Sequence, residues 1–322
     1  SSLFLMHLVT ATALTYGLWG DKRRWSNSSP VKILTPVPGY DRHCALTQSL
    51  GIEMIPIAMG PDGPDMAQAR ALAGADAAIK GIWCVPKYSN PTGCIYSDTV
   101  VDEMAALPDA AAADDFVVLW DNAYAAHDFN FPGQVLKSIF DAALVAGTAD
   151  HVVQFASTSK ITFAGGGVAF VASSERVLKA LEERLGFMMI GPDKVNQLRH
   201  ARFLSGRLEQ HMQAHAALLK PKFEIVEDTL SKELGDLDIA QWTKPGGGYF
   251  VSLDVNPGLA LEIVNMAKDV GLTLTPAGAT YPYGQDPDNC NIRIAPTFAS
   301  IEDLRTAMQI LTLCVKLSLI HI

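Results

Sequence analysis

A lysine, a carboxylate and a phenol are placed along this chain so that each lies just after an apolar run. Lys160 ends the motif Ser-Thr-Ser-Lys and follows the strand-like run 151–156. Asp121 ends the apolar run 116–120, and Tyr124 comes three residues later. A lysine amine can form an imine with an aldehyde, and a carboxylate can pair with a protonated ring nitrogen. Together these residue types suggest a pyridoxal cofactor and amino-group chemistry.

Each of these residues also has a plain structural interpretation. A lysine at the start of a loop is often a surface residue, and a single tyrosine is often part of a core. Asp121 would also serve as a helix cap or as a metal ligand. No second acidic or histidine cluster has metal-site spacing, so we expect no metal. A lone carboxylate at the end of a buried strand is costly without a partner, which favours the functional interpretation.

Further segments carry side chains that a flat, phosphorylated ring could use. Asn90 opens the turn Asn-Pro-Thr-Gly and is placed to contact a ring oxygen and a substrate carboxylate, although such a turn is ordinary by itself. Tyr40, in Pro-Gly-Tyr-Asp-Arg-His, could stack on the ring or simply pack under its loop. The hydroxyls of Ser157 and Ser159 could hold a phosphate.

Arginines are the natural partners of substrate carboxylates. Arg293 lies in the β-like run Asn-Ile-Arg-Ile-Ala-Pro, and its planar fork matches a carboxylate with two hydrogen bonds. The alternative is an edge-strand arginine in solvent. Arg199 and Arg202 are candidates for the second carboxylate of a dicarboxylic substrate, or they are charges on a helix surface.

The bulk properties exclude several classes of protein. The 322 residues are 49% hydrophobic and 18% charged, which is typical of a globular chain. A formal net charge of −9 argues against nucleic acid as a partner. The apolar segment 1–20 lacks a basic leader, so we expect a buried helix and no membrane span. Five widely spaced cysteines fit no disulfide framework and indicate a reducing, cytoplasmic location.

Short apolar runs alternate with helical patterns as far as about residue 185. The predicted strands are 31–35, 54–58, 81–85, 117–120, 152–156 and 168–172, and the predicted helices are 66–73, 97–107 and 136–146. This alternation predicts an α/β fold with a mostly parallel sheet between two helical layers. Ligands of such sheets lie beyond the carboxyl ends of the strands, where Asn90, Asp121 and Lys160 are expected.

The remainder of the chain predicts a smaller α+β unit. Residues 193–234 are helical in pattern, with Pro221 expected to break or kink the helix. The unit continues with predicted strands at 239–243, 249–253 and 291–295 and predicted helices at 259–270 and 301–317. We therefore predict a large domain over residues 1–210 and a small C-terminal domain over 211–322. Residues 317–322 are expected to form a frayed or non-native tail.

On these residues the chain resembles class I pyridoxal-phosphate (PLP) aminotransferases of fold type I, and most of all a bacterial aspartate aminotransferase subgroup. The resemblance covers essentially residues 1–316. It rests on the ordered combination of Asn-Pro-Thr-Gly, Asp-x-x-Tyr, Ser-x-Ser-Lys and the late arginine. It implies a seven-stranded-type large-domain sheet, a homodimer, and ping-pong transfer of an amino group from an L-amino acid such as aspartate to 2-oxoglutarate.

The resemblance also implies a role for each candidate residue. Lys160 would hold the cofactor and act as acid and base, and Asp121 would pair with the ring nitrogen. Tyr124 and Asn90 would contact the ring oxygen, and Tyr40 would stack on the ring. Ser157 would bind the phosphate, and Arg293 would bind the substrate α-carboxylate. Ser1 and Ser2 would be the end of a phosphate-binding turn.

Two departures from the family pattern leave alternatives open. Many members carry an arginine eight residues after the lysine, where this chain has Val168. The sequence also begins inside an expected structural element, so we expect it to be N-terminally truncated. The alternatives to an aminotransferase are a PLP-dependent lyase on the same fold, a non-catalytic PLP-binding effector module, and an inactive fragment.

Overall fold

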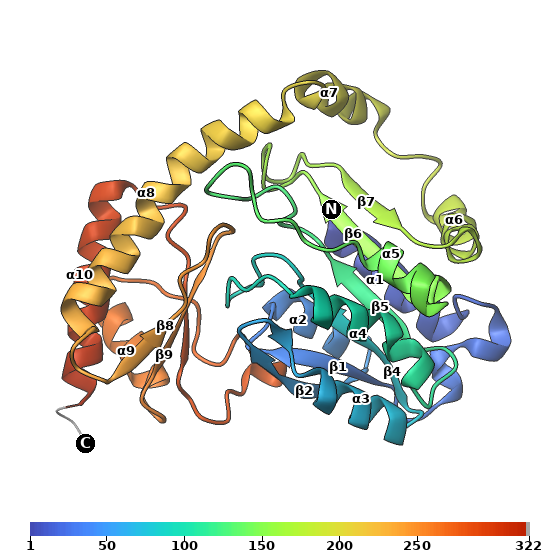
Figure 1. Cartoon of the computed structure of the whole chain (residues 1–322), viewed down its shortest axis with the longest axis horizontal. Helices are drawn as coiled ribbons and strands as arrows, with labels where there is room; N and C mark the ends of the chain where they lie inside the picture. Colours follow the sequence, from blue (N-terminus) through green and yellow to red (C-terminus); the bar gives the residue numbers. More distant parts are fainter. Residues whose placement is uncertain (320–322) are drawn as a thin grey trace.

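The computed structural model describes residues 1–319, and two sheets organise them (Figure 1). The first sheet has seven strands in the order β3-β2-β1-β4-β5-β6-β7, and the second has three in the order β10-β9-β8. The strands are β1 Lys32–Val37, β2 Glu53–Gly60, β3 Gly63–Pro64, β4 Ile79–Cys84, β5 Val117–Asp121, β6 Val152–Ser157, β7 Ala169–Ala172, β8 Ala240–Trp242, β9 Val251–Val255 and β10 Asn291–Ile294.

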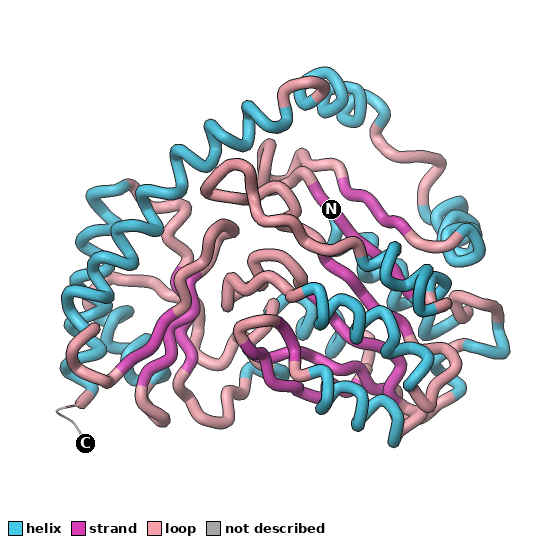
Figure 2. Tube along the Cα trace, in the orientation of Figure 1, coloured by secondary structure: helices cyan, strands magenta, loops and turns pink. Residues whose placement is uncertain are grey.

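Helices cover both sheets, as the tube view in Figure 2 shows. The α-helices are α1 Ser2–Thr15, α2 Asp41–Ser49, α3 Met66–Ala75, α4 Asp98–Ala110, α5 Ile139–Ala146, α6 Glu175–Met188, α7 Lys194–Leu204, α8 Leu208–Leu234, α9 Ala260–Asp269 and α10 Ile301–Ser318. Short 3₁₀ turns lie at 21–23, 25–27, 149–151 and 282–284.

The prediction of a mostly parallel sheet is confirmed. β1 pairs in parallel with β2 and β4, and the parallel ladder continues through β5 to β6. Only the two edge strands, β3 and β7, are antiparallel to their neighbours. The carboxyl ends of β1, β4, β5 and β6 therefore lie along one edge of the sheet, where ligands of such sheets bind.

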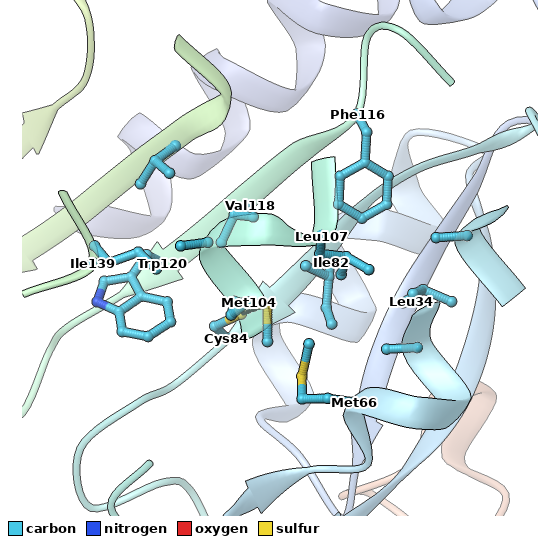
Figure 3. Packing of buried hydrophobic residues seen from close by; sticks show 14 of the residues in the cluster. Leu34, Met66, Ile82, Cys84, Met104, Leu107, Phe116, Val118, Trp120 and Ile139 are labelled. Atoms are coloured by element: carbon cyan, nitrogen blue, oxygen red, sulfur yellow. Dashed lines mark hydrogen bonds between the residues drawn. The ribbon is translucent and has the colours of Figure 1, made fainter. Parts of the chain in front are cut away.

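Successive residues of the central strands enter two different cores. Ile82, Val118 and Trp120 pack against α3, α4 and α5 (Figure 3). Their neighbours Trp83 and Leu119 face the opposite layer, which contains α1 and α6. Because side chains alternate along a strand, a strand that is covered on both faces is apolar at most of its positions, which is why these strands read as nearly continuous apolar runs.

The predicted N-terminal helix is confirmed as α1. Its buried side chains include Met6, Leu8 and Val9, which belong to the core on the α6 side of the sheet. Within residues 1–319, no helix has both the length and the apolar character that a membrane crossing requires. Burial against β6 and β7 accounts for the apolar character of α1.

The C-terminal part forms its own core around the second sheet. Buried residues of α8, β9, α9, β10 and α10 make up this cluster, including Phe223, Leu253, Ile263, Ile292 and Leu311. β9 is antiparallel to both of its neighbours, so this unit is α+β as predicted. The predicted domain boundary at 210–211 falls in the first turn of α8, and we propose α8 as the connection between the two domains.

Of the two expected effects of Pro221, a break in the helix does not occur. α8 runs without interruption from Leu208 to Leu234 and contains Pro221 in its interior. Proline removes one helical hydrogen bond. The buried Leu219 and Phe223 lie on either side of it and hold both halves of the helix against the protein, which offsets this loss.

Other boundaries differ for local reasons. α5 begins at Ile139, not at 136, because the Ser138 hydroxyl caps it by accepting from the Asp141 amide at 3.2 Å. The predicted strand 249–253 begins only at Val251. α2 and α6 were not predicted. Of the expected tail, Leu317 and Ser318 belong to α10, and residues 320–322 lie outside the described residues.

Candidate active site

Four of the predicted site residues meet at the carboxyl edge of the large sheet. Tyr40 follows β1, Asn90 follows β4, Asp121 ends β5, and Lys160 follows β6. These four strands are neighbours in the sheet, so segments 120 residues apart in the chain are brought together. The sheet register explains this convergence, because parallel strands present their carboxyl ends on one side.

Asp121 is buried, and only one of its two carboxylate oxygens has a partner. Oδ2 lies 3.0 Å from Nε2 of His43. Oδ1 has no hydrogen-bond partner among the described residues. A buried carboxylate oxygen without a donor is costly, so this atom is suited to an N–H group of a ligand.

His43 was not recognised as a site residue from the sequence. It lies in the first turn of α2, three residues after Tyr40, and its ring stacks on Trp83 at 4.3 Å between centroids with 15° between planes. Stacking and the Asp121 contact fix the imidazole in place. The only sequence signal was the position of His43 near the start of a helix behind Tyr40, which says nothing about a contact 78 residues away.

Lys160 lies between two aromatic rings. Its Nζ is 4.1 Å from the ring centroid of Tyr124 and 5.9 Å from that of Tyr40. Burial raises the pKa of both phenols, and the nearby Lys160 opposes the rise at Tyr40. Both tyrosines therefore stay protonated at neutral pH, so their hydroxyls are available as hydrogen-bond donors.

Arg293 comes from β10, in the C-terminal part, and reaches the same place. Its Nη1 donates to Asn90 Oδ1 at 3.1 Å and to Asp41 Oδ1 at 2.8 Å, and its Nε donates to Thr275 Oγ1 at 3.3 Å. The guanidinium also lies over the ring of Phe250 at 5.0 Å. The Arg293 side chain is only 10% exposed, which contradicts the alternative of an edge-strand arginine in solvent.

Ser157 and Ser159 form a small hydroxyl pair beside Lys160. The Ser157 hydroxyl donates to Ser159 Oγ at 2.9 Å and accepts from the Ser159 amide at 3.1 Å. A side chain at Gly167 would overlap Ser159, so a glycine is needed for the chain to pass this close. Hydroxyls, backbone N–H groups and a glycine-bounded turn are the elements of an anion site.

Four of the candidate residues make no hydrogen bond with the group around Asp121 among residues 1–319. Ser1 is the N-cap of α1 and Ser2 is its first residue, and within residues 1–319 neither hydroxyl makes a hydrogen bond. Arg199 and Arg202 line a cleft with Thr162, Phe163 and His211, beyond the loop that carries Lys160. Neither Arg199 nor Arg202 joins the group around Asp121.

Comparison with known proteins shows the family to which the chain belongs. A family model described as aspartate amino-transferase matches residues 1–321. An aspartate aminotransferase of Corynebacterium glutamicum is 42% identical over 320 residues, which is 99% of this chain and 73% of that protein. A crystal structure from Corynebacterium diphtheriae shows 41% identity and a TM-score of 0.97, over 100% of this chain and 79% of that chain.

A more distant structure extends the likeness of the fold. The α-aminoadipate aminotransferase of Thermus thermophilus, complexed with N-(5'-phosphopyridoxyl)-L-leucine, has a TM-score of 0.84 at 20% identity and covers 100% of this chain and 77% of that chain. The fold and the site therefore define an aminotransferase of fold type I. The chain belongs to the aspartate aminotransferase family, whose members imply PLP as the cofactor.

Proposed function

We propose that this aminotransferase moves an amino group from an L-amino acid, in the first place aspartate, to 2-oxoglutarate. The mechanism is ping-pong, so the first 2-oxoacid leaves before the second binds. The family match supports the reaction class, and the C. glutamicum relative supports the choice of donor. The observation that carries the proposal is the meeting of the Lys160 amine, the half-paired Asp121 carboxylate and Arg293 around Tyr124.

The residues present fit PLP. The unpartnered Oδ1 of Asp121 suits the protonated nitrogen of a pyridine ring, and Tyr40 and Tyr124 supply aromatic surfaces beside Lys160. When bound, PLP supplies an aldehyde that accepts the amino group and a ring that withdraws electrons from the substrate Cα. In the proposal Asp121 would pair with the ring nitrogen, and Tyr40 would supply a surface for the ring.

Lys160 has the central role in the proposed chemistry. Its Nζ would hold the cofactor, and the freed amine would act as the base that takes the proton from the substrate Cα and as the acid that returns it. Tyr124 and Asn90 would hold the ring oxygen. Their orientation is already set, since Asn90 also contacts Arg293.

The substrate α-carboxylate and the cofactor phosphate have separate partners in this proposal. We propose that Arg293 binds the substrate α-carboxylate, because its fork lies next to Asn90 and faces the Tyr124 region. Ser157 and Ser159, with backbone N–H groups of the glycine run 165–167, would bind the phosphate in place of the family's arginine. Ser1 and Ser2 are proposed to belong to the same phosphate site.

The assembly and location are also proposals. Fold type I enzymes place their sites between two subunits, and Phe187, Met188 and Ile190 at the end of α6 are exposed apolar side chains of the kind that an interface covers. We therefore propose a homodimer. All five cysteines are free, which supports the proposed cytoplasmic location.

Absorbance spectroscopy tests the cofactor role of Lys160. With PLP added, the wild-type protein should develop an imine band, Lys160→Ala should lack it, and Lys179→Ala, at an exposed lysine of α6, should keep it. A wild-type band that persists in Lys160→Ala would exclude the proposed role.

A half-reaction screen tests the substrates. We expect aspartate to convert the loaded enzyme to its amine form faster than alanine or aromatic amino acids, and 2-oxoglutarate to reverse the conversion. Release of pyruvate or ammonia without any 2-oxoacid acceptor would identify a lyase instead.

A further inference from the structure

The backbone around the proposed catalytic lysine is held by side chains from the C-terminal part of the chain. The hydroxyl of Tyr249 donates to the main-chain oxygen of Lys160 at 2.6 Å. Nε2 of His211 contacts the main-chain oxygen of the next residue, Ile161. Two consecutive carbonyl groups in the loop after β6 thus have partners that are 50 and 89 residues away in sequence.

The number of available protons fixes the direction of these bonds. Tyr249 has one hydroxyl proton, and a carbonyl oxygen can only accept, so that proton goes to Lys160. His215 Nε2, at 3.0 Å from the Tyr249 oxygen, must then be a donor. His211 Nε2 must likewise donate, because its partner is also a carbonyl. His211 and His215 are four residues apart on α8, which places both rings on one side of the helix.

Burial influences the protonation state of two of these donors, Tyr249 and His215. Burial, with a smaller contribution from Tyr124, raises the pKa of Tyr249 well above its ordinary value, so the phenol remains protonated. Burial and the neighbouring His211 lower the pKa of His215. The Tyr249 ring also packs against Tyr124 at 5.9 Å and His127 at 5.4 Å, so its hydroxyl is aimed by packing.

All three side chains are anchored in the C-terminal part. α8 continues from His215 to Phe223 and Leu230, which are buried in the second core, and Tyr249 lies two residues before β9 in the second sheet. Figure 1 shows α8 running from the side of β6 and β7 to the side of β8 and β9. The C-terminal core and the loop of Lys160 are therefore connected by hydrogen bonds as well as by the chain.

We propose that Tyr249, His211 and His215 act as a positioning clamp that fixes the main chain of Lys160 and thereby the place of its ε-amine. This proposal rests on the proposed catalytic role of Lys160. Because the carbonyl groups of residues 160 and 161 are hydrogen-bonded, the backbone from which the flexible lysine side chain extends is restricted. Misplacement of a reacting group by about 1 Å can lower a rate by roughly two orders of magnitude, so even a modest loosening should be measurable.

The clamp predicts a specific kinetic and dynamic effect of Tyr249→Phe. This change removes one hydroxyl and keeps the ring, so we expect kcat to fall roughly tenfold while KM for the amino donor changes by no more than about twofold. In the cofactor-free protein, amide hydrogen exchange over residues 158–163 should become faster. Tyr16→Phe is the matched control, since the half-exposed Tyr16 hydroxyl has no hydrogen-bond partner among residues 1–319.

Two variants of His215 separate hydrogen bonding from packing. His215→Gln keeps a side-chain N–H donor and should retain most of kcat and of the slow exchange, whereas His215→Leu should lose both. Equal amide exchange rates over residues 158–163 in Tyr249→Phe and Tyr16→Phe would overturn the clamp. Equal kcat and equal exchange rates in the two His215 variants would overturn it as well. The exchange measurement needs no cofactor. A wild type that does not transaminate would therefore refute the proposed function and leave this test of the clamp intact.

Discussion

Nη1 of Arg293 lies 2.8 Å from Oδ1 of Asp41, so the arginine proposed to bind the substrate already has a carboxylate partner within the chain. Asp41 is in the first turn of α2 and is partly exposed, whereas Arg293 is nearly buried. The two residues are 252 positions apart and come from different parts of the fold. A substrate carboxylate must share the guanidinium with Asp41 or displace it.

This pairing predicts that Asp41→Asn strengthens the binding of amino donors. Removing one negative charge next to the binding site should favour a carboxylate ligand by about 1 kcal/mol, which is roughly a fivefold lower KM. Asparagine keeps an oxygen that can accept from Arg293. Steady-state kinetics with aspartate will measure the change, with Asp109→Asn on the exposed end of α4 as the control. A raised KM would show that Asp41 orients Arg293 and does not compete with the substrate.

The pairing of His43 with Asp121 leads to a prediction about cofactor affinity. In His43→Leu, both buried oxygens of Asp121 lack a partner, so the carboxylate loses the contact that orients it. We expect PLP to bind roughly tenfold more weakly, because supporting residues of this kind typically contribute at least that much. Fluorescence titration of the cofactor-free protein will measure the affinity. The variant His43→Gln, which keeps an N–H donor, should lie between the wild type and His43→Leu, and an affinity unchanged in His43→Leu would contradict the role of His43.

The strands and the residues that follow them could be predicted from the sequence because both are local patterns. Runs such as 117–120 are buried on both faces and read as continuous apolar segments. In a parallel sheet, the segments that follow such runs lie along one edge, so the sequence places Asp121 at this edge and Asn90 and Lys160 in the loops that leave it.

The contacts that orient these residues could not be predicted, because they depend on tertiary packing. His43 and Asp121 meet only when α2 packs against the sheet, and Tyr249 meets Lys160 only when the segment before β9 packs against the loop after β6. The continuity of α8 through Pro221 is of the same kind, since packing of distant residues overrides a local signal. By contrast, α6 had a readable start, because Ser174 caps it and Val177 and Leu181 follow at helical spacing.

The glycine run at 246–248 predicts a sharp difference between two alanine variants. A Cβ at Gly247 would overlap the main-chain oxygen of His127 and the ring of Tyr88, whereas a Cβ at Gly246 would meet its nearest neighbour, Tyr88, at 3.9 Å. Gly247 also pairs with Asp128, so this loop joins the C-terminal part to the segment after Tyr124. We expect Gly247→Ala to lower transaminase kcat at least tenfold, and Gly246→Ala to stay within about twofold of the wild type. Similar activities in both variants would show that the loop can move without affecting the site.

The buried imidazole of His127 predicts how stability depends on pH. Burial, followed by repulsion from Lys160 and His215, lowers the pKa of His127 from 6.5 to about 3, and neither ring nitrogen has a partner among the described residues. Below pH 6.5 the unfolded chain binds a proton at this position and the folded protein does not, so stability falls as the pH falls. Between pH 8 and pH 5 this group alone should lower the free energy of unfolding by about 2 kcal/mol.

The variant His127→Phe isolates this contribution, because it keeps an aromatic ring beside Tyr124 and Tyr249 but cannot bind a proton. Urea unfolding of the cofactor-free protein at pH 8 and pH 5 should therefore show a difference between the two pH values that is smaller by about 2 kcal/mol in the variant than in the wild type. The comparison uses the change with pH, so any loss of packing that is the same at both pH values cancels. An identical pH dependence in the two proteins would mean that His127 is protonated in the folded state, and that a charged partner reaches it at low pH.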